Sequence, residues 1–127
     1  MTSASQYTKK VLDHFKNPRN FGEMKNPDVE VMVGNPTCGD VIKLGLKIKN
    51  NKIKDIKFQT MGCAAAIATS SMMTVLVKGK SLKEAEKLTP KDIAKALGNL
   101  PAIKFHCSTL GITALKKAIK QYLSNHN

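Results

Sequence analysis

The feature that most limits the fold of this chain is an alternation of apolar and polar residues in its middle. Between residues 41 and 49, aliphatic side chains occupy every second position, and lysines occupy three of the positions between them. After Asn50-Asn51, Ile56 and Phe58 continue the apolar face in residues 53–59. A period of two is typical of strands with one buried face, and a short Asn-rich link is typical of a hairpin. The pattern therefore predicts two antiparallel strands, 41–49 and 53–59, that are solvated on one side.

Further elements are expected on both sides of this hairpin. The alternating valines of 29–33 predict a third strand, stopped by Gly34-Asn35-Pro36, and the turn-rich stretch 17–27 predicts a loop that wraps the domain. The predicted helices, judged by apolar spacing and capping residues, are 5–16, a nearly buried helix at 64–77, two short ones opened by Ser81 and by Thr89-Pro90, and 107–123. Residues 99–104 should form an extended connection.

These elements predict an α+β two-layer sandwich, in which helices cover one face of a three-stranded antiparallel sheet. A length of 127 residues fits one domain, 1–127. No apolar run approaches the roughly 20 residues that a membrane helix needs. The first twenty residues resemble neither a signal sequence nor a transit peptide, so we expect a cytoplasmic protein.

The net charge of +12 raises the question of nucleic-acid binding. The cations are nearly all lysines, spread over solvent positions of the predicted strands and helices, and no cluster of aromatic stacking residues accompanies them. We therefore expect no nucleic-acid partner. The lysine surface instead favours acidic protein partners.

Three cysteines carry the chemical signal. Cys38 is followed by Gly39-Asp40, Cys63 opens the predicted buried helix, and His106-Cys107 opens the last one. An odd number of cysteines without a signal peptide argues against a disulfide framework, and Gly, Asp and His are unusual neighbours for thiols that only fill a core. Helix N-termini lower the pKa of thiols and favour thiolates. If the fold gathers the three boundaries, it forms a three-thiolate pocket.

The spacing of the cysteines narrows the chemistry of that pocket. Structural zinc sites usually contain paired ligands such as C-x2-C, whereas these cysteines are about 25 and 44 positions apart. Three thiolates and one variable ligand, Asp40 or His106, suit a tetrahedral zinc or a loosely held [2Fe-2S] cluster. A stable zinc module and a thiol enzyme, with Cys107 as nucleophile and His106 as base, stay open as alternatives at this stage.

The residues also match a known family. From Tyr7 to Leu123 the chain resembles IscU, the NifU-like scaffold of iron–sulfur cluster assembly, with the SufE/NifU-like fold. The matching segments, in chain order, are 11–20 with Gly22, then 34–40, 62–64, 77–82 and 106–108. The resemblance maps the assembly residues onto five positions of this sequence: Cys38, Asp40, Cys63, His106 and Cys107.

The resemblance implies a scaffold that is not itself an enzyme. A pyridoxal-phosphate cysteine desulfurase would deliver persulfide sulfur to Cys107 or Cys63, and a labile [2Fe-2S] cluster would be built with iron and passed to acceptor apoproteins. Zinc is possible in the empty site. The resemblance leaves open whether the chain works as a monomer or a homodimer.

One segment departs from the family pattern. Bacterial members carry Leu-Pro-Pro-Val-Lys where this chain has Leu100-Pro101-Ala102-Ile103-Lys104. The departure puts recognition by the family's Hsp70-type chaperone in doubt, or indicates transfer without one.

Overall fold

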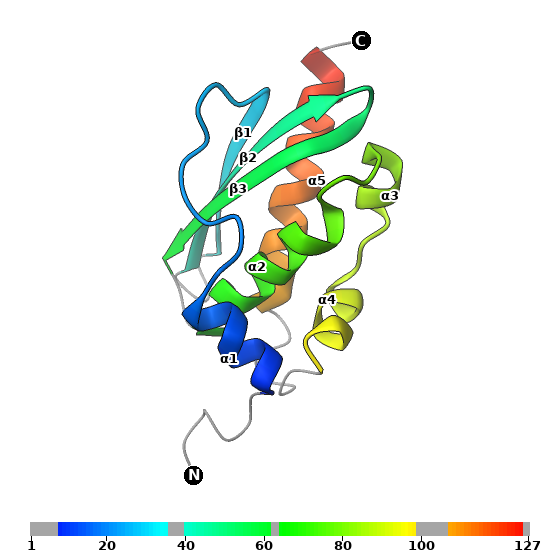
Figure 1. Cartoon of the computed structure of the whole chain (residues 1–127). Helices are drawn as coiled ribbons and strands as arrows, with labels where there is room; N and C mark the ends of the chain where they lie inside the picture. The colour runs from blue at the N-terminus through cyan, green and yellow to red at the C-terminus, as the bar shows by residue number, and fades with distance from the viewer. Residues whose placement is uncertain (1–7, 36–39, 62–63, 99–106, 126–127) are drawn as a thin grey trace.

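The computed structural model describes residues 8–35, 40–61, 64–98 and 107–125. In chain order the elements are α1 (Lys9–Lys16), β1 (Val29–Asn35), β2 (Asp40–Lys49), β3 (Lys52–Met61), α2 (Ala64–Val77), α3 (Leu82–Glu86), α4 (Pro90–Ala96) and α5 (Cys107–Asn125). The strands form one layer and the helices lie on one side of it, with α2 and α5 nearest the sheet (Figure 1). The predicted two-layer sandwich is confirmed.

The sheet is an antiparallel meander in the order β1-β2-β3. Its tightest turn lies at Asn50 and Asn51, whose φ angles of 55° and 60° are left-handed. Asparagine tolerates this region better than most residues, and two successive positive φ angles match the twist of a two-residue hairpin. The predicted hairpin is therefore present, and the pairing of β2 with β3 shifts by one residue between Lys47 and Ile48.

The core lies between the sheet and the helices. The alternating residues of the strands supply one half, since Leu44, Leu46 and Phe58 are fully buried. α5 packs against β1 and β2, and α2 packs against β3 and α5. The apolar stripe predicted for the last helix provides part of the other half, with Leu115 and Ile119 fully buried.

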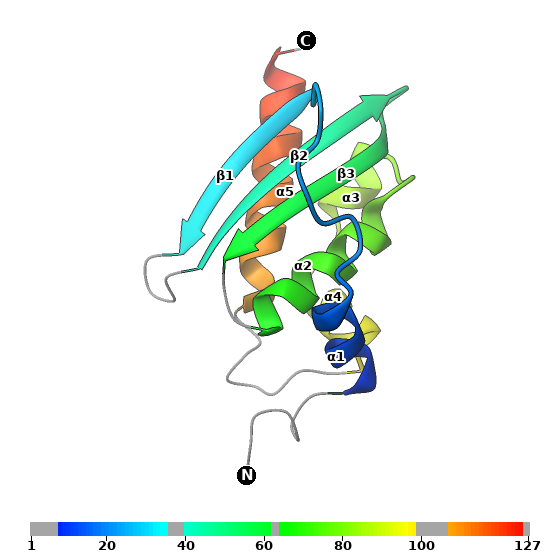
Figure 2. The same cartoon turned by 60° about the vertical axis from the view of Figure 1, so that its left-hand side comes forward.

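The segment between α1 and β1 crosses the solvent-facing side of the sheet (Figure 2). Asn20 O accepts from Phe58 N at 3.0 Å, and Phe58 O accepts from Gly22 N at 2.9 Å, so the segment first runs along the edge of β3. It then passes over Gly45, where a Cβ atom would meet Met24 Cβ at 3.5 Å, an ordinary contact distance. The predicted wrapping loop thus packs directly on the sheet at this position.

The first helix differs from the expectation in two respects. It begins at Lys9 rather than at residue 5, because Thr8 has an extended backbone and its side chain accepts a hydrogen bond from Val11 N, as an N-cap does. Its buried face is formed by Val11 and His14, whereas Phe15, which the apolar spacing included, is 40% exposed.

The two short helices begin where the capping residues predict. Ser81 and Glu84 form a reciprocal capping box at α3, and Thr89 and Asp92 form another at α4. After Leu97, the C-cap of α4, Gly98 takes a φ of 82°. The predicted extended connection at 99–104 lies outside the described residues. None of the described helices is long and apolar enough to cross a membrane.

Candidate metal centre

The structure describes the backbone positions of two of the five predicted ligands, Asp40 and Cys107. Asp40 is the first residue of β2 and pairs with Asn35, the last residue of β1. Cys107 is the first residue of α5. Cys38, Cys63 and His106 lie outside the described residues. Their neighbours in the chain, however, are described and limit where these three residues can be.

The flanks of Cys38 and Cys63 leave the sheet at the same end. Cys38 belongs to the four-residue link 36–39 that joins Asn35 to Asp40, which pair with each other across β1 and β2. Met61, the last residue of β3, pairs with Val41, the neighbour of Asp40. Adjacent strands are about 4.8 Å apart, so the link that carries Cys38 and the link that carries Cys63 start from neighbouring positions.

Helices α2 and α5 begin at this same end of the sheet, as both views show (Figures 1 and 2). The early part of α5 packs against the middle of α2, where a Cβ atom on Gly111 would lie 3.1 Å from Met73 Sδ and 3.8 Å from Ser70 Oγ. Glycine at 111 thus permits a close approach of the helices. The first residue of α2, Ala64, directly follows Cys63 in the sequence, and the first residue of α5 is Cys107.

We call this region the site end: the ends of β1 and β3, the start of β2, and the starts of α2 and α5. Within the described residues there is no group of three or more His, Cys, Asp or Glu side chains that could hold a metal ion. The arrangement of the flanking backbones therefore carries the case for a shared site, and the five-residue ligand set stays a prediction.

An apolar hollow of about 330 Å³ lies beside the site end, on the solvent-facing side of the sheet. It is lined in part by the exposed side chains of Phe21, Met32, Val41 and Met61, of which Met61 is 83% exposed. Exposed apolar residues that cluster in this way are typical of surfaces that contact other proteins. The hollow therefore gives the site end a surface suited to a protein partner.

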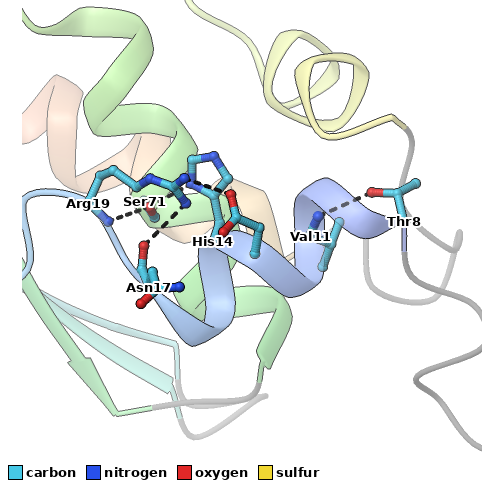
Figure 3. Close-up of polar contacts among 7 residues, drawn as sticks. Thr8, Val11, His14, Asn17, Arg19 and Ser71 are labelled. Atoms are coloured by element: carbon cyan, nitrogen blue, oxygen red, sulfur yellow. Dashed lines mark hydrogen bonds and ion pairs between the residues drawn. The ribbon is translucent and has the colours of Figure 1, made fainter.

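A polar cluster under α1 was not foreseen in full from the sequence (Figure 3). The imidazole of His14 is only 7% exposed, and its Nδ1 atom lies 2.7 Å from Ser71 Oγ on α2. The same hydroxyl oxygen accepts a hydrogen bond of 2.8 Å from Arg19 N. Ser71 thus holds both the end of α1 and the chain that follows it. His14 is thus a buried packing residue that bonds to α2.

The electrostatics of this cluster favour the neutral form of His14. Burial, followed by the positive charge of Arg19, lowers the pKa of His14, while Asp13 acts in the opposite direction. Arg19 Nη2 lies 2.6 Å from Asp13 Oδ2, and this hydrogen bond lowers the pKa of the Asp13 carboxyl. The spacing of His14 three residues after Val11 was the available signal, because residues three apart share one helix face.

The polar residues inside α2 have a related role. Thr74 Oγ1 donates to Ser71 O at 2.6 Å and accepts from Asn20 Nδ2 at 3.0 Å. Asn20 has a positive φ of 58° and lies in the segment that runs along the edge of β3 on its way to β1. The buried serine and threonine of an otherwise apolar helix therefore anchor the chain after α1 to α2 through their side chains.

The comparisons with known proteins agree on one family. The model of the NifU-like N terminal domain matches residues 6–127. The chain is 55% identical over 116 residues to "Iron-sulfur cluster assembly scaffold protein IscU 1" of Archaeoglobus fulgidus, which covers 91% of this chain and 76% of that protein. It is 48% identical to the IscU scaffold protein of Aquifex aeolicus, with 93% and 76% covered. A mitochondrial iron sulfur cluster assembly protein 1 of Yarrowia lipolytica is 52% identical, with 93% and 67% covered.

Solved structures show the same fold. A crystal structure of a hypothetical protein superposes with a TM-score of 0.71 at 37% identity, covering 87% of this chain and 94% of that one. A putative scaffold protein for the SUF system from Fervidobacterium islandicum gives a TM-score of 0.77 at 24% identity, with 93% and 99% covered. At that identity the likeness supports the fold alone.

Proposed function

This chain belongs to the family of NifU-like N-terminal domains, and from that premise we propose that it is a scaffold on which iron–sulfur clusters are assembled for delivery to other proteins. The observation that carries the proposal is the identity of about one half to named scaffold proteins over nine tenths of the chain. The match over residues 6–127 also supports a single scaffold domain.

The geometry of the site end supports the chemistry of this proposal. The chain segments that carry Cys38 and Cys63 start from adjacent strands, and Cys107 opens a helix at the same end. We propose that the three thiolates, with Asp40 or His106, hold a [2Fe-2S] cluster as cargo. A carboxylate or an imidazole in place of a fourth thiolate leaves the cluster open to exchange, which suits a carrier.

Sulfur would arrive from a cysteine desulfurase as a persulfide. The thiolate of Cys107 or Cys63 attacks the outer sulfur, so one S–S bond forms on the scaffold as the other breaks, and the desulfurase thiolate leaves. Reduction of that sulfur to sulfide then needs two electrons from an external donor. The scaffold itself would not act as an enzyme in this scheme, because it only receives, holds and transfers its cargo.

The hollow lined by Phe21, Met32 and Met61 supports contact with protein partners beside the cargo. The desulfurase and the acceptor apoproteins are the partners we propose. Recognition by an Hsp70-type chaperone stays open, because Ala102-Ile103 lies outside the described residues. The cytoplasmic location also stays a prediction, since some relatives are named as mitochondrial proteins.

Anaerobic reconstitution tests this proposal. The purified chain is supplied with iron, cysteine, a desulfurase and a reductant, and is followed by visible absorption and by iron and sulfide analysis. We expect the absorption of a [2Fe-2S] cluster with iron and sulfide in equal amounts, lost when Cys38, Cys63 or Cys107 is replaced by alanine. One tightly held zinc that iron and sulfide do not displace would contradict the proposal and favour a zinc module instead.

The role of Asp40 has a separate test. As a hard oxygen ligand it should make the cluster easier to release, so Asp40→Ala should slow transfer to an apo-ferredoxin. The half-time of transfer measures this, and a rate that is unchanged or faster would rule the role out.

A further inference from the structure

Two methionines of the sheet are highly exposed, and both line the hollow beside the site end. Met32 is 61% exposed and Met61 is 83% exposed. Met32 on β1 pairs with Lys43 on β2. Met61 on β3 pairs with Val41, which is two residues from Lys43. Residues that pair across antiparallel strands share a face of the sheet, as do residues two apart on one strand. The two methionine side chains therefore lie on the same, solvent-facing side.

The other methionines that the structure describes are better protected. Met72 is 8% exposed, and Met73 is fully buried in the core between the sheet and the helices. Met24 is half-buried. Because an oxidant reaches a thioether only where the sulfur atom is accessible, Met32 and Met61 should react before these three.

The hollow is apolar although a lysine lines it. Lys43 Nζ lies 3.7 Å from a carboxylate oxygen of Glu23 and 3.7 Å from one of Glu30, so its charge is offset. The ring of Phe21 lies edge-to-face with that of Phe58, with the ring centroids 5.3 Å apart, and this contact supports one wall of the hollow. The polarity of the hollow therefore depends largely on its two thioether groups.

We propose that Met32 and Met61 form a reversible oxidation site that weakens docking of the cysteine desulfurase on this hollow. In the oxidation, hydrogen peroxide transfers one oxygen atom to the thioether sulfur: the O–O bond breaks, an S=O bond forms and water leaves. The sulfur loses two electrons and the peroxide gains them. A methionine sulfoxide reductase reverses the change with two electrons from a pair of thiols, which become a disulfide as water leaves.

The inference rests on the proposed function, since it takes the desulfurase as the occupant of the hollow. A sulfur donor must dock beside the thiolates that it supplies, and Met61 ends β3 at the site end, two residues before Cys63 in the sequence. Methionine is a flexible, apolar side chain that adapts to a partner, whereas its sulfoxide is polar. A sulfoxide oxygen that docking buries without a hydrogen-bond donor opposes binding. We expect about tenfold weaker binding when both residues are oxidised.

Three variants separate the effect of oxidation from the effect of substitution. Met32→Leu with Met61→Leu keeps apolar side chains of similar volume that peroxide does not oxidise. Met32→Gln with Met61→Gln places polar side chains in the hollow without oxidation. Met24→Leu is the matched control, because Met24 packs on the same side of the sheet, at Gly45, but does not line the hollow.

The measurement begins with the thiols blocked as mixed disulfides, because thiolates react with peroxide before thioethers do. Each chain is treated with hydrogen peroxide, freed of it, and reduced with dithiothreitol, which restores the thiols but leaves methionine sulfoxide unchanged. Peptide mass spectrometry locates the sulfoxides, and titration calorimetry gives the Kd for the desulfurase. Binding of cobalt(II), followed by the thiolate-to-cobalt absorption bands, shows whether the treated chain still holds a metal.

In the unmodified chain, Met32 and Met61 should carry the first sulfoxides, and the Kd for the desulfurase should rise about tenfold while cobalt binding is unchanged. Methionine sulfoxide reductases should restore the original Kd. The double Leu variant should bind the desulfurase equally well before and after peroxide, and the double Gln variant should bind it weakly without peroxide. Met24→Leu should respond to peroxide as the unmodified chain does.

Two results would overturn the inference and leave the proposed function standing. In one, the better protected methionines are oxidised as fast as Met32 and Met61; in the other, the oxidised chain binds the desulfurase as tightly as the untreated one. A loss of binding in the peroxide-treated double Leu variant would also overturn it, because another residue would then be responsible. If the untreated chain does not bind the desulfurase, the proposed function itself is contradicted, and the inference fails with it.

Discussion

The hairpin end of the sheet and the region around α1 are attached to their neighbours in different ways. At the hairpin end, the backbone of β3 bonds to the turn between α2 and α3: Ile53 N donates to Lys80 O at 2.9 Å, and Ile53 O accepts from Gly79 N at 2.8 Å. Around α1, side chains supply the bonds to α2 and to Leu97, as with Ser71 to His14 and Thr8 to Leu97. Backbone bonds survive most substitutions, whereas a side-chain bond is lost with its residue.

This difference predicts which substitutions change only the stability of the fold and which also change metal binding. The backbone bonds of Ile53 at the hairpin end do not depend on a particular side chain. The bonds around α1 each depend on one side chain, such as Ser71 or His14. We therefore expect substitutions at the hairpin end to change the free energy of unfolding, and substitutions around α1 to change metal binding as well.

The largest effect on stability is expected at the hairpin end. Ile53 is fully buried, so Ile53→Ala should lower the free energy of unfolding by about 2–5 kcal/mol through lost burial and a residual cavity. Urea unfolding measures this change. Cobalt affinity, measured under conditions where the variant remains folded, should be unchanged.

Val11→Ala sharpens the same comparison at the other end. Val11 is as deeply buried as Ile53 but belongs to α1. The smaller side chain should cost less stability, yet the variant should bind cobalt more weakly than Ile53→Ala does. The distinction between the two ends fails if Ile53→Ala weakens cobalt binding as much as Val11→Ala.

A smaller loss in the free energy of unfolding is expected for Ser71→Ala. The substitution leaves Arg19 N and the His14 ring without their shared partner, and an unsatisfied buried group costs about 1–3 kcal/mol. Urea unfolding measures the total loss in the free energy of unfolding. Faster hydrogen exchange at the Arg19 amide would show that the lost bond is the one to Ser71. Ser70→Ala is the control, since Ser70 is buried one residue earlier but faces α5 near Gly111. Equal losses in the two variants would contradict the role given to Ser71.

The smallest effect concerns pH. Because the pKa of His14 is lower in the folded chain than in the unfolded one, the unfolded state binds more protons as the pH falls. The contribution of His14 to stability should be complete above about pH 6.5 and decrease as the pH falls below that value. His14→Gln should lack this decrease.

The free energy of unfolding is measured for the unmodified chain and for His14→Gln from about pH 7 down to about pH 5.5. The difference between the two chains at each pH gives the contribution of His14. The other two histidines are common to both chains, so their titration largely cancels in the difference. Parallel pH profiles would show that His14 is protonated equally well in the folded and unfolded states, against the burial described above.

How much the sequence could predict depends on the range of each interaction. The alternation around Asn50-Asn51 and the capping boxes at Ser81 and Thr89 are local patterns, and they predicted the hairpin and two helix starts correctly. The bonds of α1 join residues 57 and 89 positions apart. No local pattern reports such pairs, so Thr8 and Ser71 gave no signal before the fold was known.

The site shows the same limit. The sequence named Cys38, Asp40, Cys63, His106 and Cys107, and the resemblance to scaffold proteins assigned them a shared role. The strand register explains why Asp40 and the flanks of Cys38 and Cys63 meet at one end of the sheet. The order of strands, which no single motif encodes, was needed for that step.

The most direct test of the central claim counts the sulfur atoms around one bound metal. X-ray absorption at the zinc edge of the chain, loaded with one equivalent of zinc, reports the number and type of the nearest neighbours. The account predicts three sulfur ligands at about 2.3 Å and one oxygen or nitrogen ligand. A shell with one sulfur or none would show that the three cysteines do not meet, and would contradict the account.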